Sequence, residues 1–137
     1  MHHNQSTIIS MKIQLQPSEA EGIFHSSLCN IYGSGYFNGY GLEFIWDDDD
    51  YAAARKKLAS PCKEDVLLQI IKDGGILGVI DHECDGEYNA HIDLKIIHER
   101  MELVKPRNLL NIINEEDDID DADAVLQTLF FGEVIFG

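Results

Sequence analysis

The segment LGVIDHECDGEYNAHIDL, residues 77–94, carries the clearest structural signal in this chain of 137 residues. Asp85-Gly86 lies between two runs that are typical of β-strands, and a two-residue type I′ turn needs positive φ at both central positions. We therefore predict a β-hairpin with these two residues as its loop, in which Val79 pairs with Ile92.

This pairing divides the side chains of the hairpin between two faces, because residues that pair across two strands share a face. One face is predicted to join the hydrophobic core and holds Leu77, Val79, Ala90, Ile92 and Leu94. The other face is mostly polar, and His82 and His91 are diagonal neighbours on it, roughly 5–7 Å apart at Cβ.

The polar face contains four side chains of the types that bind zinc and other divalent metals. They are His82, Cys84, Glu87 and His91. The alternative is an ordinary solvent-facing surface, and no C-x-x-C or H-E-x-x-H motif supports the metal site. Carboxylates towards the hairpin tip offer a second arrangement, for Mg²⁺ or Ca²⁺, at Asp81, Glu83, Asp85 and Glu87.

The rest of the chain predicts helices and a few further strands. Apolar residues at helical spacing indicate helices that begin near Ser18, Asp49, Pro61, Lys95, Pro106 and Ala122. Further strands are expected at Met11–Leu15, Gly41–Trp46 and Glu133–Phe136, and Asn38-Gly39 is a candidate second hairpin turn. In the second of these strands, Leu42, Phe44 and Trp46 should face the core.

This order of elements predicts an α+β fold, with a mostly antiparallel sheet of four to six strands and helices packed on one face. We expect residues 1–10 to be a disordered N-terminal extension and residues 11–137 to form a single domain. Apolar residues make up 45% of the chain, enough for a hydrophobic core.

The charge is strongly acidic, with 25 acidic and 10 basic residues and a net charge of −15. This argues against direct binding of nucleic acid or an anionic membrane, since both require clustered Lys and Arg. A basic protein partner or a bound cation would suit this charge, and so would a role in solubility alone.

The densest acid is EEDDIDDAD at residues 115–123, and residues 114–137 hold eight acidic residues and no basic ones. An EF-hand loop does not fit, because the sixth position counted from Asp118 is Asp123 instead of Gly. Part of the acid suits a helix N-terminus. We predict that a basic protein partner binds at Glu115, Glu116, Asp117, Asp118, Asp120 and Asp121.

The chain has three cysteines, Cys29, Cys62 and Cys84, and an odd count without C-x-x-C indicates a reducing compartment. No run resembles a signal peptide or a transmembrane helix, so we expect a cytoplasmic location. A thiol nucleophile is conceivable at Cys62, which we place in the first turn of a helix, where the dipole favours a thiolate. An inert structural cysteine is the alternative.

Two functional hypotheses follow, and neither assigns a catalytic or cofactor-binding residue. The first is a small acidic cytoplasmic protein-binding module, such as an adaptor, an inhibitor or an immunity-type protein, with mimicry of nucleic-acid charge as one form of it. The second is a metal-dependent or thiol enzyme that uses the polar face of the hairpin.

Overall fold

The structure is a computed structural model that describes residues 13–137, and these residues form an α+β fold. In chain order the elements are α2 (Pro17–Tyr32), α3 (Tyr36–Gly39), β1 (Leu42–Ile45), α4 (Asp48–Lys56), α5 (Lys63–Lys72), β2 (Leu77–Asp81), β3 (Ala90–Ile92), α6 (Leu94–Arg100), the 3₁₀ turn η1 (Met101–Leu103), α7 (Pro106–Ile113) and α8 (Ile119–Phe131). None of the helices described is long and apolar enough to cross a membrane.

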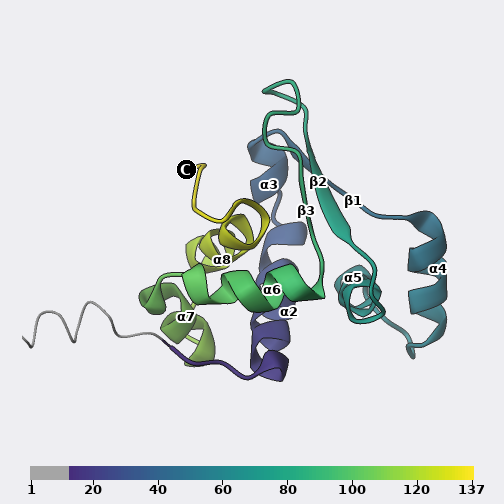
Figure 1. The fold of residues 1–137 in the computed structure, drawn as a ribbon, viewed down its shortest axis with the longest axis horizontal. Coiled ribbons are helices and arrows are strands. Elements are labelled where there is room, and N and C mark those ends of the chain that lie inside the picture. Colours follow the sequence, from purple (N-terminus) through teal and green to yellow (C-terminus); the bar gives the residue numbers. More distant parts are fainter. Residues whose placement is uncertain (1–12) are drawn as a thin grey trace, which may run out of the picture.

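The sheet is antiparallel and its strand order is β1-β2-β3 (Figure 1). The prediction of four to six strands is wrong for the described residues, which contain three. Ile13 and Leu15 lead into α2 without pairing, and the rest of that predicted strand lies outside the described residues. Asn38-Gly39 belongs to the short helix α3 instead of a hairpin turn.

The predicted last strand, Glu133–Phe136, is also absent, because a side chain takes the place of a neighbouring strand. The backbone N–H groups of Ile135 and Phe136 both donate to Oε1 of the buried Gln127, at 2.8 Å each. The amide group of Gln127 therefore satisfies donors that a sheet would otherwise pair.

The β2–β3 hairpin forms where it was predicted, but its register differs by two residues, and Val79 pairs with Ala90 instead of Ile92. A shift of two keeps every side chain on its face. The predicted core residues Leu77, Val79 and Ile92 are accordingly buried.

The two-residue loop is wrong, because the strands end early and residues 82–89 form a longer loop. Asp85 and Gly86 do have positive φ, 53° and 82°, as the turn chemistry predicted. Asp81 accounts for the difference. Its buried carboxylate accepts hydrogen bonds from the N–H groups of Cys84 at 2.9 Å, Glu83 at 3.0 Å and Tyr88 at 3.1 Å.

Those N–H groups would otherwise be free to pair across the hairpin, so a carboxylate at the strand end competes with the ladder. The N–H of Cys84 contributes most to holding the pKa of Asp81 below its usual value, and burial opposes the effect. Asn89 completes the closure, since its side-chain oxygen accepts the N–H of Asp81 at 2.7 Å. Asp81 thus fixes the loop as a structured projection from the sheet.

Helix starts follow the acidic residues, although not always at the predicted position. The helices predicted near Asp49 and Lys95 form as α4 and α6, and Asp47 and Asp93 cap them. The helix predicted near Ser18 forms as α2, which begins at Pro17; its N-cap is Gln16, whose N–H donates to Glu19 at 2.9 Å. The helix predicted from Pro61 begins two residues later, as α5 at Lys63. Cys62 is therefore the N-cap of α5 and does not lie in its first turn.

The core is built on α2 and α8, which pack against each other and against the inner face of the sheet. Leu42 is 2% exposed, as predicted for its strand. Phe44 and Trp46 are only half-buried, because they lie towards the outer margin of the sheet. The sheet therefore has one face packed on helices and one strand, β1, with a partly exposed aromatic margin.

Candidate functional site

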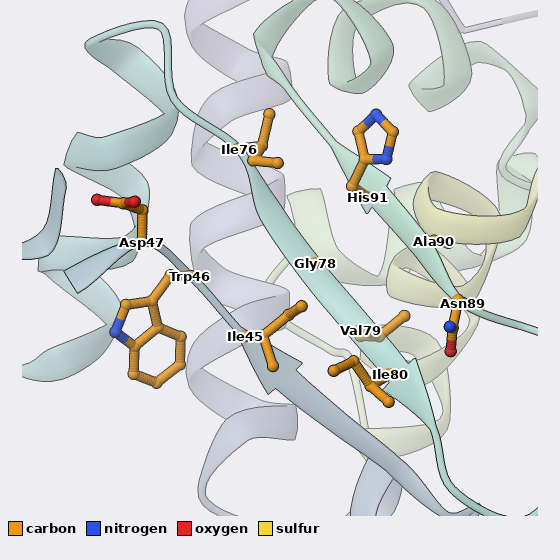
Figure 2. Close-up of a pocket in the computed structure, with 10 residues that line it drawn as sticks. All are labelled: Ile45, Trp46, Asp47, Ile76, Gly78, Val79, Ile80, Asn89, Ala90 and His91. Atoms are coloured by element: carbon orange, nitrogen blue, oxygen red, sulfur yellow. The ribbon is translucent and has the colours of Figure 1, made fainter. Parts of the chain in front are cut away.

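The outer face of the sheet, away from α2 and α8, carries a hollow of about 520 Å³. Figure 2 shows Ile45, Ile76 and His91 on the near side of the strands, with helices behind the sheet. Ile45, Ile76 and Ile80 are apolar residues of its lining, and His91 of β3 lies beside them. We call this hollow the outer hollow.

Gly78 explains why the hollow exists. It lies between Ile45 and His91 in the sheet, paired with one on each side. A Cβ atom at this position would lie 2.9 Å from Cγ1 of Ile45, too close for either side chain to stay in place. The missing side chain lets Ile45 lie across β2 and leaves the floor of the hollow to backbone.

Two large hydrophobic side chains of the outer hollow are exposed to solvent. Ile45 is 39% exposed and Ile76 is 47% exposed, and both are large hydrophobic residues. Asp47 and His91 are the titratable residues of the lining. Such a composition suits the binding of an apolar side chain with few polar constraints.

A second hollow, of about 230 Å³, lies beside β1 and against the ends of α2 and α3. We call it the aromatic hollow, because Tyr32, Phe37, Phe44 and Trp46 line it. The rings of Phe37 and Phe44 stack with centroids 5.1 Å apart and an interplanar angle of 3°. Trp46 borders both hollows, so this half-buried indole marks the boundary between them.

One cation lies against this boundary. Nζ of Lys63 is 5.2 Å from the ring centroid of Trp46 and 5.8 Å from that of Tyr32. Tyr51 stacks on Trp46 with centroids 5.8 Å apart. These contacts fix the indole in place, since its packing partners come from three different elements.

The structure does not bring His82, Cys84, Glu87 and His91 together as a metal site. His91 lies opposite Gly78, whereas His82 follows β2 and its imidazole contacts Glu43 at 2.8 Å. The two-residue shift in register moves the histidines roughly 13 Å apart along the strand direction. Among residues 13–137, no group of three or more His, Cys, Asp and Glu side chains could hold a metal ion, including the carboxylates near the hairpin tip.

The six acidic residues proposed for partner binding differ in what they do. Asp118 caps α8 through the N–H groups of Asp120 and Asp121, and Asp120 accepts the hydroxyl of Tyr36 at 3.1 Å. Asp117 accepts Nδ2 of Asn30 at 3.2 Å. The side chains of Glu115 and Glu116 are exposed, and no described residue hydrogen bonds to them.

Asp121 is a structural residue, only 6% exposed. Burial alone would raise its pKa, but hydrogen bonds outweigh burial and hold the pKa below its usual value. They come from Nδ2 of Asn108 at 2.8 Å, Nδ2 of Asn111 at 3.2 Å and the N–H of Asp118 at 3.1 Å. Asp121 therefore joins α7 to α8 and is not available to a partner.

The cysteines include an arrangement that resembles a catalytic triad at first sight. Nε2 of His25 lies 3.8 Å from Sγ of Cys29 and 2.9 Å from Oδ1 of Asp65. A general base must present one ring nitrogen to the nucleophile and the other to the carboxylate. Here the same nitrogen faces both, so it cannot donate to Asp65 and accept from Cys29 at once.

The electrostatics around Cys29 also oppose a nucleophile. Burial, followed by the negative charge of Glu64, raises the pKa of the Cys29 thiol to about 11. A reactive cysteine needs a lowered pKa, because the thiolate is the nucleophile. Cys62 and Cys84 are exposed, and neither has a histidine hydrogen-bonded to its sulfur among the described residues.

Two residues that shape this region, Gly78 and Asp81, were not among the predicted site residues of the outer face. A glycine inside a strand signals a close approach, and that signal was present at Gly78. Ile45 and Ile80 alternate with the predicted core residues of their strands, and an apolar residue at such an outward position is itself a signal. Comparisons with protein-family models, with curated proteins and with solved structures find no match to this chain.

Proposed function

We propose that this protein is a small acidic cytoplasmic protein-binding module, and that its partner binds on the outer hollow. The observation that carries the proposal is the exposed apolar surface of Ile45 and Ile76 around a floor of Gly78. Covering such a surface is favourable, at roughly 25 cal/mol per Å² of apolar area removed from water.

Binding is favoured over catalysis by what surrounds the hollow. A catalytic pocket needs a nucleophile, base or metal near an enclosed cavity, with a second group to orient it. The lining offers one imidazole, His91, and no described residue hydrogen bonds to that ring. Among residues 13–137 no group of side chains could hold the metal of the enzyme hypothesis, and the pKa of the Cys29 thiol beside His25 is raised to about 11.

The net charge of −15 supports a basic partner. Asp47 borders the outer hollow, and Asp48, Asp49 and Asp50 follow it in the exposed first turn of α4. This acid lies at the hollow itself, unlike Glu115 and Glu116. A carboxylate rim around an apolar centre raises the association rate of a basic partner and excludes acidic ones.

The proposal can be tested by site-specific photo-crosslinking in the native source. The photoreactive residue replaces Ile45 in one protein and Leu103 in another. Leu103 is a matched control, because it is also large, apolar and 60% exposed, but lies on η1. We expect a discrete heterologous adduct from position 45 only. Equal adducts from both positions would contradict a specific site.

A substitution gives an independent test of the same face. Ile76→Asp places a charge on the apolar surface at a position that is already 47% exposed. We expect the free energy of unfolding to change by less than about 0.5 kcal/mol, as for other surface substitutions, while the adduct from position 45 disappears. An adduct that persists in this variant means that the partner does not use the outer hollow.

A further inference from the structure

We infer that the partner of this protein binds as an additional β-strand along the free edge of β1. The partner segment is extended, carries an apolar side chain at the position opposite Phe44, and carries Lys or Arg where it passes Asp47–Asp50. This inference rests on the proposed function and specifies its binding mode and the chemistry of the bound segment.

The first step is the direction of the backbone groups of β1. The N–H of His82 donates to the carbonyl of Gly41 at 2.9 Å, which makes these two residues a hydrogen-bonded pair. Such pairs alternate along an antiparallel ladder. Glu43 and Ile45 therefore face β2, and the N–H and C=O groups of Leu42 and Phe44 face away from the sheet.

Those outward groups are unpaired. No backbone or side-chain group of residues 13–137 hydrogen bonds to the N–H or C=O of Leu42 or Phe44 outside the sheet ladder, and β1 has β2 as its one neighbour among the described strands. An unpaired strand edge is a template for pairing with another extended chain. Two outward residues offer two donors and two acceptors to that chain.

The second step is the space beside the edge. Successive side chains of an added strand would point alternately to the two faces of the sheet. The residue opposite Phe44 would point to the inner face, where the aromatic hollow lies beside β1. Its neighbours would point to the outer face, beside Ile45 and the outer hollow (Figure 2). Both faces of an added strand thus meet a cavity.

The third step is charge, which sets the chemistry of the segment. Lys63 already occupies the aromatic boundary, 5.2 Å from the centroid of Trp46, so the residue in the aromatic hollow should be apolar and uncharged. Beyond the end of β1, Asp47–Asp50 present four carboxylates. A Lys or Arg at that end of the segment would meet opposite charge.

A second copy of this chain is the competing occupant, and charge disfavours it. Each copy carries a net charge of −15, so two copies repel one another when their β1 edges approach. A basic segment of another protein has no such penalty. We therefore assign the edge to a heterologous partner.

The test combines selection of peptides with hydrogen exchange. Random linear peptides of about ten residues are displayed and selected on the full-length protein, because peptides of this length suffice for strand addition. Exchange rates of the amides in β1 are then measured by NMR, with and without the best selected peptide. Emission from Trp46, the one tryptophan of the chain, reports occupancy.

The amides of Leu42 and Phe44 should exchange rapidly in the free protein and at least about tenfold more slowly with peptide bound. The amides of Glu43 and Ile45 are the internal control, since β2 already protects them. Selected peptides should be enriched in Lys and Arg. Peptides can be methylated on every second backbone nitrogen, in two alternating sets. Methylation of the set that faces β1 should abolish binding, and methylation of the other set should leave binding intact.

Three results would overturn the inference. The amides of Leu42 and Phe44 could already be protected in the free protein, either within one chain or within a dimer seen by sedimentation. Selection could yield no peptide that binds the protein. Bound peptides could leave these amides unchanged. In the last two cases, a persistent adduct from position 45 would keep the proposed function and remove only strand addition.

Discussion

Gln127 in α8 is a single side chain that holds the C-terminal segment, and replacing it should be costly. The residue is fully buried, and both atoms of its amide group are used. Oε1 accepts the N–H groups of Ile135 and Phe136, while Nε2 donates to Asp123 at 2.9 Å and to the carbonyl of Phe136 at 3.2 Å. Gln127→Ala removes all four hydrogen bonds.

The magnitude follows from these four bonds. A neutral hydrogen bond contributes about 1 kcal/mol net, and one to a charged acceptor about 1.5–3 kcal/mol, so the bonds together represent roughly 5 kcal/mol. Part of this is recovered if the segment detaches, because water then hydrates its N–H groups. We therefore expect the free energy of unfolding to fall by about 2–4 kcal/mol.

Urea denaturation followed by circular dichroism measures the loss, and hydrogen exchange locates it. The amides of Ile135 and Phe136 should lose protection first. Gln127→Met is the matched control, since it keeps the volume of the side chain and removes only its polar atoms. If Gln127→Ala unfolds within about 0.5 kcal/mol of the wild-type protein, the hydrogen bonds of this side chain do not hold the segment.

Three further predictions concern titratable groups. Because hydrogen bonds lower the pKa of Asp81, its carboxylate stabilises the fold at neutral pH and that stability is lost as the pH falls through the lowered pKa; Asp81→Asn should speed amide exchange in the 82–89 loop at pH 7, and equal exchange in the two proteins would refute the anchoring role. Because burial raises the pKa of Asp123 despite hydrogen bonds from Tyr40 and Gln127, the wild-type protein should gain stability on acidification relative to Asp123→Asn in urea titrations; parallel stability curves would contradict this. The Cys29 thiol, with a pKa of about 11, should react with iodoacetamide about tenfold faster per pH unit without levelling off near pH 8.5, where an ordinary thiol does.

Local signals in the sequence predicted local structure well. Positive φ at Asp85 and Gly86 and the helix starts near Asp49 and Lys95 depend on residues within a few positions of one another. The faces of the hairpin were also predicted, because side-chain alternation survives a shift of two residues. The predicted register of the hairpin was wrong. The carboxylate of Asp81 accepts the N–H groups of Cys84 and Tyr88, which therefore do not pair between the strands, and these hydrogen bonds are seen only in the folded loop.

The candidate site was beyond the reach of the sequence for a related reason. The outer hollow depends on Gly78 of β2 lying beside Ile45 of β1, residues that are far apart in the chain. For the acidic run at residues 115–123, the sequence showed the charge but not the role of each residue. Its composition was plain, but only the structure separates the buried Asp121, which accepts from Asn108 at 2.8 Å, from exposed residues such as Glu115.

The acidic excess and the free edge of β1 are connected by the need to avoid self-association. Proteins usually protect an edge strand with an inward charge, a proline or a bulge, and the four residues of β1 contain only Glu43 as a charged side chain. Glu43 is already paired with His82. Protection of this edge must come from longer-range repulsion, and the net charge of −15 supplies it between identical copies. The same field attracts a basic chain, so one feature keeps copies apart and leaves the edge open to a partner of opposite charge.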